Sequence, residues 1–342
     1  MAELLADTHA LLEGLNEAAV IAAGARVLAS NSAAKALLGA GIDGEPLNRV
    51  ISHPAALEAL ERADHEYEGL EDVELTGLGG SRRNWLMRTA PLADDTWLIR
   101  FVDRSEVAAA EQMRVDFVAN ASHELRTPLS TLIGYTETLR EQGEEIDPGT
   151  RERFLAVVHD EARRMQRIVE DLISLSRIEA EKFTAPTEAV DLRPLIDQAL
   201  SSVKRIADER RSPLVSEVDA DLPAVAADRG QVLQLLDNLI TNALRYGEPE
   251  TPVTVSAHAE GSMVHLAVRD QGEGIAPEHV KRVTERFYRV DTSRSRSLGG
   301  TGLGLSIVKH IVERHRGRLM IESELGKGTT VHVLLPLAGA ES

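Results

Sequence analysis

Cysteine is absent from this chain of 342 residues, and aromatic side chains make up only 3% of it. The absence of cysteine excludes disulfides, cysteine-bound metal sites and thiol chemistry, and it suits a reducing compartment. With so few aromatic residues, the cores must be built mainly from Leu, Val, Ile and Ala, which dominate the 43% of hydrophobic residues. A chain of this length is long enough for two or three domains, each with its own core.

Long apolar runs and positive charge are also scarce. No apolar stretch approaches the about 18 residues that a membrane span needs, since the run Ala18–Ala23 is short and ends at Gly24. The N-terminus lacks a basic segment followed by a cleavable apolar one. Acidic residues outnumber basic ones by 55 to 38, and the net charge of −17 argues against direct nucleic-acid binding. We expect a cytoplasmic chain, which meets a membrane only if it is part of a longer parent.

Residues 1–104 have the pattern of a small α+β domain. The expected elements are a helix at Leu4–Leu15, strands at Ala19–Ala23 and Val27–Ala29, a helix capped by Asn31 or Ser32 that ends near Gly39, and strands at Asp72–Thr76, Asn84–Thr89 and Thr96–Val102. This layout resembles a PAS sensor domain, although it contains no sharp motif. Trp85 and Trp97 are expected in its core, and the sequence does not define a ligand pocket.

Residues 105–182 are expected to form a helical hairpin that continues from the first domain without a break. Steps of seven from Val118 reach Leu125, Leu132 and Leu139, an apolar row typical of a bundle helix. A loop at Gly143–Gly149, with Pro148, separates it from a second helix. That helix has apolar residues at Phe154, Val158, Met165, Ile168, Leu172 and Leu175. Two such helices cannot cover their own apolar surface, so we expect two hairpins to pair as a homodimeric four-helix bundle.

The first helix carries the most unusual local feature of the chain. On its heptad pattern His123 falls opposite the apolar row and beside Glu124, so a titratable ring is displayed to solvent. Pro128 follows inside the apolar pattern, where a proline costs about 3 kcal/mol. A displayed histidine beside a kink suggests a functional site, and an ordinary surface histidine is the alternative. Pro128 is a candidate hinge.

Residues 190–338 are expected to form a two-layer α/β sandwich, after a linker at Phe183–Val190. The expected elements are helices at Leu192–Ala207, at Arg229–Tyr246 with Asp228 as cap, around Pro277–Glu285 and at Leu303–His315, a strand at Leu214–Val218, and hairpins of Val253–Ala257 with Val264–Val268 and of Leu319–Ser323 with Thr330–Leu335. The whole chain is therefore expected to be multidomain α+β.

Three groups of residues in this last region suggest a nucleotide site. Asn238, Asn242 and Arg245 share one face of a helix, where amide oxygens suit Mg²⁺ and a guanidinium suits phosphate; a solvated polar stripe is the alternative. Asp270-x-Gly-x-Gly274 follows a strand, where its carboxylate could accept from the amine of a base; the alternative is an ordinary Asp–Gly loop. The glycine-rich turn Gly300–Gly304 opens a helix whose backbone donors suit phosphate. It is not a P-loop and does not follow a strand.

The order of these motifs is more specific than any one of them. His123-Glu-Leu-Arg-Thr-Pro128, Asn238-x-x-x-Asn242, Asp270-x-Gly272-x-Gly274, Phe287-Tyr-Arg289 and Gly300-Thr-Gly-Leu-Gly304 resemble the H, N, G1, F and G2 boxes of sensor histidine kinases. The resemblance spans residues 106–336. The loop Arg289–Gly300 is similar to that of phosphate-regulon sensor kinases. One departure is Arg316-Gly317, where the family often has paired glycines.

The resemblance implies an ATP-dependent protein-histidine kinase with ATP and Mg²⁺ as cofactors. His123 would accept the γ-phosphoryl group, Glu124 would be the general base, and Thr127 would position a water that dephosphorylates the partner. Asn242, with Asn238 beside it, would hold Mg²⁺. The other nucleotide-binding positions would be Arg245, Tyr246, Asp270, Gly272, Gly274, Gly300, Thr301, Gly302, Leu303, Gly304 and either Arg294 or Arg296.

The implied partner is a response regulator, which would receive the phosphoryl group on an Asp and dock on the hairpin near Leu129 and Thr136. Two other functions fit part of the pattern. A serine kinase of the same ATPase superfamily would lack the hairpin with His123, and a nucleotide-binding sensor scaffold would have no kinase output. The sequence names neither the input signal nor the cognate regulator, and it gives no balance between kinase and phosphatase activity.

Overall fold

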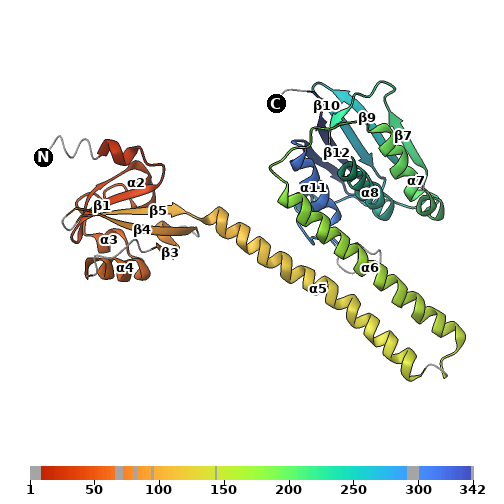
Figure 1. Cartoon of the computed structure of the whole chain (residues 1–342), viewed down its shortest axis with the longest axis horizontal. Coiled ribbons are helices and arrows are strands. Elements are labelled where there is room, and N and C mark those ends of the chain that lie inside the picture. The colour runs from red at the N-terminus through yellow and green to blue at the C-terminus, as the bar shows by residue number, and fades with distance from the viewer. Residues whose placement is uncertain are drawn as a thin grey trace. The chain divides into compact units, whose positions relative to one another are not determined.

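The computed structural model describes residues 9–65, 72–80, 83–93, 96–142, 145–290 and 300–339. It divides into two compact units, Met1–Val118 and Ala119–Ser342. Figure 1 follows the chain through both. The finer division into domains at 1–104, 105–182 and 190–338 stays a prediction.

The first unit is built on a five-stranded antiparallel sheet in the order β2-β1-β5-β4-β3. Its elements are β1 (Ala18–Ala23), β2 (Arg26–Ser30), α2 (Ser32–Leu38), α3 (Leu47–Val50), α4 (Pro54–His65), β3 (Asp72–Thr76), the 3₁₀ turn η1 (Leu78–Gly80), β4 (Asn84–Ala93) and β5 (Thr96–Asp103). The strands predicted from alternating apolar residues are confirmed. Helices α3 and α4 were not anticipated. Residues 9–13 are helical, and the start of the expected helix at Leu4–Leu15 lies outside the described ranges.

Asn31 lies immediately before helix α2 of this unit. Its side chain is buried, and its Oδ1 accepts hydrogen bonds from the backbone N–H of Ala19 at 3.0 Å and of Ala34 at 2.9 Å. Asn31 is therefore the cap of α2, and of the two predicted candidates Ser32 is the first helical residue. Trp85 packs against the main core as expected, and Trp97 is half-buried.

Two long helices form the hairpin: α5 (Ser105–Glu141) and α6 (Pro148–Ala180). Helix α5 is continuous through Pro128, which is buried. The prediction that Pro148 belongs to the loop is wrong, because Asp147 caps α6 by accepting from the Thr150 N–H at 3.0 Å, and a proline at the first helical position loses no hydrogen bond. Within the described ranges, no helix has the length and hydropathy to cross a membrane.

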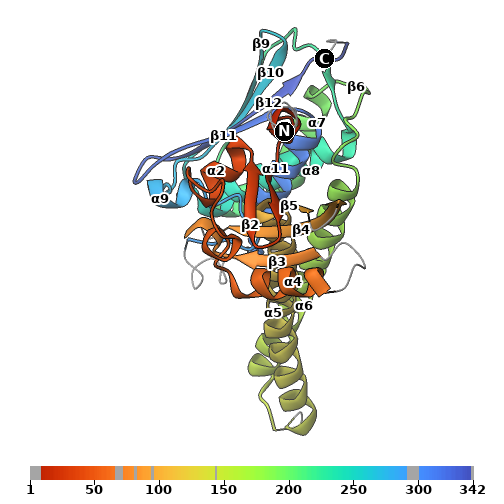
Figure 2. The ribbon, with the colours of Figure 1, turned by 90° about the vertical axis from the view of Figure 1, so that its left-hand side faces the viewer.

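The rest of the second unit is an α/β layer structure. Its strands are β6 (Ala189–Val190), β7 (Leu214–Val218), β8 (Val225–Ala226), β9 (Val253–Glu260), β10 (Met263–Arg269), β11 (Arg318–Glu324) and β12 (Gly328–Pro336), and its helices are α7 (Arg193–Arg210), α8 (Arg229–Tyr246), α9 (Pro277–Val280) and α11 (Gly304–Arg314). The main sheet has the order β11-β12-β10-β9-β7, and the β7–β9 pair is parallel. Helices α7, α8 and α11 lie on one of its faces (Figures 1 and 2).

Two expectations for this region need correction. The predicted helix around Pro277–Glu285 ends at Val280, and the chain beyond it continues as turns, in which the N–H groups of Arg282 and Val283 both donate to the His279 carbonyl. The expected linker ends in a strand, β6, which pairs with β8. The other predicted elements are present, and Asp228 caps α8 through a 3.1 Å bond from the Gln231 N–H. Arg316, where the family often has glycine, adopts a left-handed φ of 53°.

Candidate functional site

The asparagine pair on α8 lies against the start of α11. Asn238 and Asn242 are half-buried and one helical turn apart. A Cβ atom added at Gly304, the first residue of α11, would lie 2.9 Å from Asn238 Oδ1 and 3.6 Å from Asn242 Nδ2. With the two amides where they stand, a side chain at this position would press on the Asn238 amide. The structure brings together two motifs that are far apart in the sequence.

Asp270 is the buried carboxylate at the end of β10. Its Oδ1 accepts from the N–H of Gly272 at 2.9 Å and from that of Thr329 at 3.2 Å. Burial raises the pKa of Asp270, and the two backbone hydrogen bonds partly offset this by lowering it. A Cβ at Gly272 would lie 2.2 Å from the Tyr246 carbonyl oxygen, so this loop packs directly on the end of α8. Gly274, at φ 71°, packs equally closely on the β11–β12 turn.

The glycine-rich turn is joined to the Phe287–Arg289 segment and to α6. The Phe287 N–H donates to the Gly302 carbonyl at 2.9 Å, and Gly302 has a left-handed φ of 73°. The Thr301 hydroxyl donates to Asp171 Oδ2 at 2.9 Å and accepts from the Leu303 N–H at 3.2 Å. Leu303 is fully buried, and Gly300 is buried as well. The turn is thus held by the Phe287–Arg289 segment and by α6.

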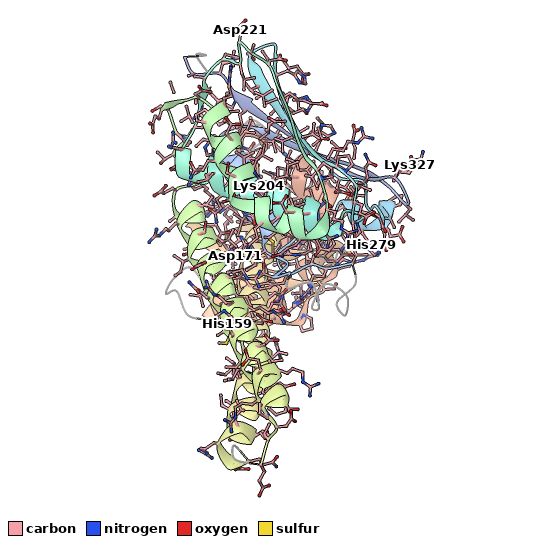
Figure 3. The ribbon with its side chains drawn as sticks, turned by 90° about the vertical axis from the view of Figure 1, so that its right-hand side faces the viewer. His159, Asp171, Lys204, Asp221, His279 and Lys327 are labelled. Atoms are coloured by element: carbon pink, nitrogen blue, oxygen red, sulfur yellow. The ribbon has the colours of Figure 1, made fainter. Side chains whose placement is uncertain are left out.

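Asp171, which sequence reasoning missed, lies on α6 close to the proposed phosphate-binding residues (Figure 3). Burial raises its pKa, while Thr301 and Arg167 act to lower it. Burial lowers the pKa of Arg245, which interacts with Tyr246, Arg167 and Asp171. Tyr246 is 46% exposed. The available signal was an acidic residue next to Leu172 within the apolar pattern of the second hairpin helix.

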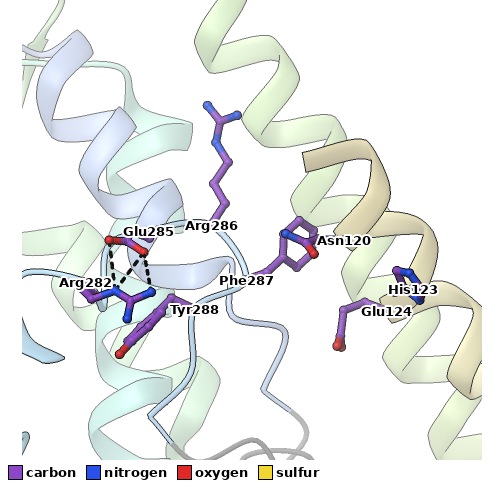
Figure 4. A pocket seen from close by; sticks show the side chains of 8 residues that line it. All are labelled: Asn120, His123, Glu124, Arg282, Glu285, Arg286, Phe287 and Tyr288. Carbon is purple, nitrogen blue, oxygen red and sulfur yellow. Dashed lines mark hydrogen bonds and ion pairs between the residues drawn. The ribbon is translucent and has the colours of Figure 1, made fainter. Parts of the chain in front are cut away.

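His123 lines a cavity between α5 and the segment that follows α9. The cavity has a volume of about 310 Å³ and is lined by Asn120, His123, Glu124, Arg282, Glu285, Arg286, Phe287 and Tyr288 (Figure 4). His123 itself is exposed, as its heptad position predicted. Arg282 lies over the Tyr288 ring at 4.2 Å and pairs with Glu285 at 3.3 Å. The imidazole therefore faces the same segment that supports the glycine-rich turn.

Two arginines hold the carboxylate beside His123. Arg164 of α6 lies 3.0 Å from Glu124 Oε2, and Arg289 lies 3.7 Å from the same oxygen. Both guanidinium groups are largely buried, with side chains 8% and 6% exposed. Two ion pairs to the same oxygen restrict the orientation of the carboxylate. Removing either arginine would also be costly, because it would break a largely buried ion pair. Arg164 was missed, although it stands four residues before the buried Ile168 on an apolar helix face.

Two further expectations concern residues near the site. The Thr127 hydroxyl is exposed and donates to the His123 carbonyl at 3.3 Å, one turn back along α5. Arg294 and Arg296 lie outside the described residues, so the choice between them stays open.

The C-terminal half of α6 packs on the α/β layers through polar contacts that the sequence did not reveal. Ser174 donates to Gln234 at 2.7 Å, Arg314 pairs with Glu181 at 2.6 Å, and Arg286 pairs with Glu179. The Arg286 guanidinium also lies 3.4 Å from His310 Nε2. Burial, assisted by Arg286, lowers the pKa of His310 to about 4.

Comparison with known families agrees with this arrangement. Residues 113–181 match the family described as His Kinase A (phospho-acceptor) domain, and residues 227–339 match the Histidine kinase-, DNA gyrase B-, and HSP90-like ATPase family. The chain is 36% identical over 306 residues to the phosphate regulon sensor protein PhoR of Pseudomonas aeruginosa, covering 88% of this chain and 67% of that protein. It is 40% identical over 226 residues to the sensor protein SrrB of Staphylococcus aureus, covering 66% of this chain but only 38% of SrrB.

Solved structures show the same fold. The Acinetobacter baumannii histidine kinase AdeS is 25% identical, with a TM-score of 0.51, over 63% of this chain and 98% of that one. The histidine kinase ThkA, solved in complex with the response regulator protein TrrA, has a TM-score of 0.52 and 20% identity, and covers 96% of this chain and 98% of that one. The chain belongs to the family of two-component sensor histidine kinases.

Proposed function

We propose that this chain phosphorylates itself on His123 from Mg-ATP and passes the phosphoryl group to an aspartate of a response regulator. The observation that carries the proposal is the exposed His123 ring in a cavity shared with the Arg282–Tyr288 segment. That segment bonds to the glycine-rich turn through the Phe287 N–H. A phosphoacceptor has to meet the nucleotide in this way, because phosphoryl transfer depends mainly on positioning and on neutralising charge.

The chemical step requires a neutral, oriented imidazole. One ring nitrogen of His123 attacks the γ-phosphorus, the new N–P bond forms, and the bond to the bridging oxygen breaks so that ADP leaves. Glu124 accepts a hydrogen bond or the proton from the other ring nitrogen, as a general base does. Arg164 and Arg289 hold the Glu124 carboxylate in place for this role.

The family implies ATP binding, and we propose the residues that hold the nucleotide. Asn242, with Asn238 beside it, offers amide oxygens to Mg²⁺, which favours oxygen ligands. The ion would neutralise phosphate charge. Gly304 supports this fit, since a side chain there would press on the Asn238 amide. Asp270 uses Oδ1 for backbone donors, and we assign Oδ2 to the adenine amine.

The remaining nucleotide contacts follow from the same arrangement. Arg245 and Tyr246 would contact phosphate and nucleotide from the end of α8, and Gly272 and Gly274 keep the Asp270 loop open. The turn Gly300–Gly304 offers backbone donors at the start of α11. Arg294 or Arg296 would close over the γ-phosphate.

We also propose three properties of the whole protein. A homodimer would cover apolar side chains that a single hairpin leaves exposed, among them Leu129, Ile133 and Ile173 at 46–50%. Thr127 would support dephosphorylation of the regulator, and the first unit would act as a PAS-like sensor. A response regulator as partner is supported by the ThkA–TrrA complex, in which a similar kinase fold binds one.

A labelling experiment tests the phosphoacceptor. His123→Gln should lose all phosphoryl incorporation from ATP labelled at the γ position, while its affinity for Mg-ATP stays at the wild-type value. The matched control is His159→Gln, which removes another exposed histidine of the hairpin, on α6 (Figure 3), and should label normally. Wild-type labelling of His123→Gln would sink the proposal.

A further inference from the structure

Three of the 11 histidines of the chain gather on the sheet face opposite helices α7, α8 and α11. Strands β9, β10 and β12 are neighbours in the sheet (Figure 2), and each contributes one. His258 stands directly opposite His265, and His332 stands opposite Ala267, two residues further along β10. The flanking residues Val264, Leu266, Val331 and Val333 are buried on the helix side. The alternation of strand side chains therefore places the three rings together on the open face.

The ring nitrogens of these histidines form a continuous row. His265 Nδ1 lies 3.2 Å from His258 Nε2, and His265 Nε2 lies 3.0 Å from His332 Nδ1. One carboxylate lies beside the middle ring, and another lies at the His332 end. Glu260 Oε2 is 3.7 Å from His265 Nδ1, and Glu322 Oε2 is 3.6 Å from His332 Nε2.

Proton positions along the row follow from the contacts between its rings. The side chains of His265 and His332 are only 17% and 16% exposed. A neutral imidazole has one donor and one acceptor nitrogen. If His265 Nε2–H donates to His332 Nδ1, then the other nitrogen of His332 carries its proton toward Glu322.

This arrangement leaves three electron-pair donors converging at the other end of the row. They are His265 Nδ1, His258 Nε2 and the Glu260 carboxylate, and their ligand atoms all lie within 4.8 Å of one another. A hydrogen bond between His258 Nε2 and His265 Nδ1 would satisfy these two nitrogens, but it would supply no cation to the Glu260 carboxylate. A divalent ion would satisfy all three atoms at once.

The distances also suit a tetrahedral ion. Zinc–nitrogen and zinc–oxygen bonds of about 2.1 Å place neighbouring ligand atoms roughly 3.4 Å apart. Two of the three separations, 3.2 Å and 3.7 Å, lie on either side of that value, and all three ligand atoms lie within 4.8 Å of one another. A metal-bound histidine normally donates its other N–H to a fixed acceptor, and His332 takes that place for His265.

We propose that His258, Glu260 and His265 form a zinc-class metal site on the open face of this sheet, with His332 and Glu322 orienting His265. Two imidazoles and a carboxylate match the ligand preference of Zn²⁺ and leave a fourth position for water. The Mg²⁺ site proposed for the nucleotide is built from asparagine amides on α8 and shares none of these residues. The metal site is therefore independent of the phosphotransfer proposal.

The experiment uses the untagged chain, since a histidine tag would bind the same ions. Zn²⁺ is titrated by calorimetry, and Co²⁺ is titrated as a spectroscopic probe, with Mg-ATP absent and then saturating. We expect one ion per chain, an intense visible Co²⁺ band typical of tetrahedral coordination, and no competition from Mg-ATP. His265→Gln and His258→Gln should each weaken binding at least tenfold, while His159→Gln should bind as the wild type does.

The outcomes separate the proposal from its alternatives. Failure to bind either ion near pH 7 would show that the row is only a hydrogen-bonded chain. Wild-type affinity in both His265→Gln and His258→Gln would place the ion elsewhere, and loss of binding with Mg-ATP would place it in the nucleotide site. His258 is exposed, so its variant tests the proposal even if His265→Gln folds poorly.

Discussion

Gly304 shows how one missing side chain shapes the proposed nucleotide site. It starts α11 so close to α8 that a Cβ would lie 2.9 Å from Asn238 Oδ1. Because that oxygen ends a side chain that can rotate, the fold should survive a substitution while the paired amides move. The glycine thus matters for the position of the two amides more than for the stability of the helix.

Gly304→Ala should therefore weaken Mg-ATP binding about tenfold, which corresponds to about 1.4 kcal/mol, with little change in melting temperature. The measurement is calorimetric titration of ATP in excess Mg²⁺. Gly134→Ala on α5 is the matched control, because its Cβ would meet no described atom within 4 Å. Equal affinities in the two variants would contradict the placement of the Asn238 amide at the nucleotide.

At the scale of elements, the contact between α6 and α11 contains a group that titrates. His310 of α11 lies beside Arg286 and Glu179, and its pKa is lowered from 6.5 to about 4 by burial first and then by Arg286. The folded state thus binds fewer protons at His310 than the unfolded chain between these two pH values. Its contribution to stability is complete above pH 6.5 and is lost as the pH falls toward 4.

His310→Gln should make the stability of the fold depend less on pH in this range. The full shift would correspond to about 3 kcal/mol, and solvent screening of the partly exposed ring reduces the expected effect to roughly 1 kcal/mol. Melting temperatures at pH 7.5 and pH 5 measure it: the wild type should lose more on acidification than the variant. His159→Gln, at an exposed position, should behave like the wild type. Parallel losses in all three proteins would refute the role of His310.

Helix α5 bears on the hinge hypothesis for Pro128. It remains one helix of 37 residues through the proline, which is buried rather than displayed. The structure therefore shows that the helix continues through the proline, and the hinge itself stays a hypothesis.

At the scale of the whole molecule, the proposed homodimer rests on the hairpin. Apolar side chains of both helices are about half exposed in the single chain, including Leu129 and Ile133 on α5 and Leu155 and Ile173 on α6. Covering such surface is favourable by about 25 cal/mol per Å². Two hairpins packed as a four-helix bundle would cover it.

Ile133→Glu should turn the proposed dimer into a monomer, because a charge buried in the bundle would lose its hydration. Light scattering after size-exclusion chromatography measures the mass. Arg140→Glu, at a position 77% exposed on the same helix, introduces a larger change of charge and should remain dimeric. A wild-type chain of monomeric mass would remove the basis for the dimer.

Much of the fold was predictable because its signals are local. Alternating apolar residues gave the strands, and Asp228 and Gly247 gave the ends of α8, since each signal lies within a few residues of what it determines. Strand β6 was missed for the opposite reason, because its partner β8 is distant in the sequence. The expected helix to Glu285 was wrong although the contacts there are local, since the chain leaves the helix at Val280 and continues as turns.

The sequence by itself determined the family, the displayed His123 and the order of the nucleotide motifs, because these depend on residue type and spacing along the chain. Only the tertiary structure decided which distant side chains meet. Arg164 reaches Glu124 across 40 residues, and Thr301 reaches Asp171 across 130. The histidine row likewise exists only because β10 lies between β9 and β12 in the sheet. Helix packing and strand order set these contacts, and neither is a local property of the chain.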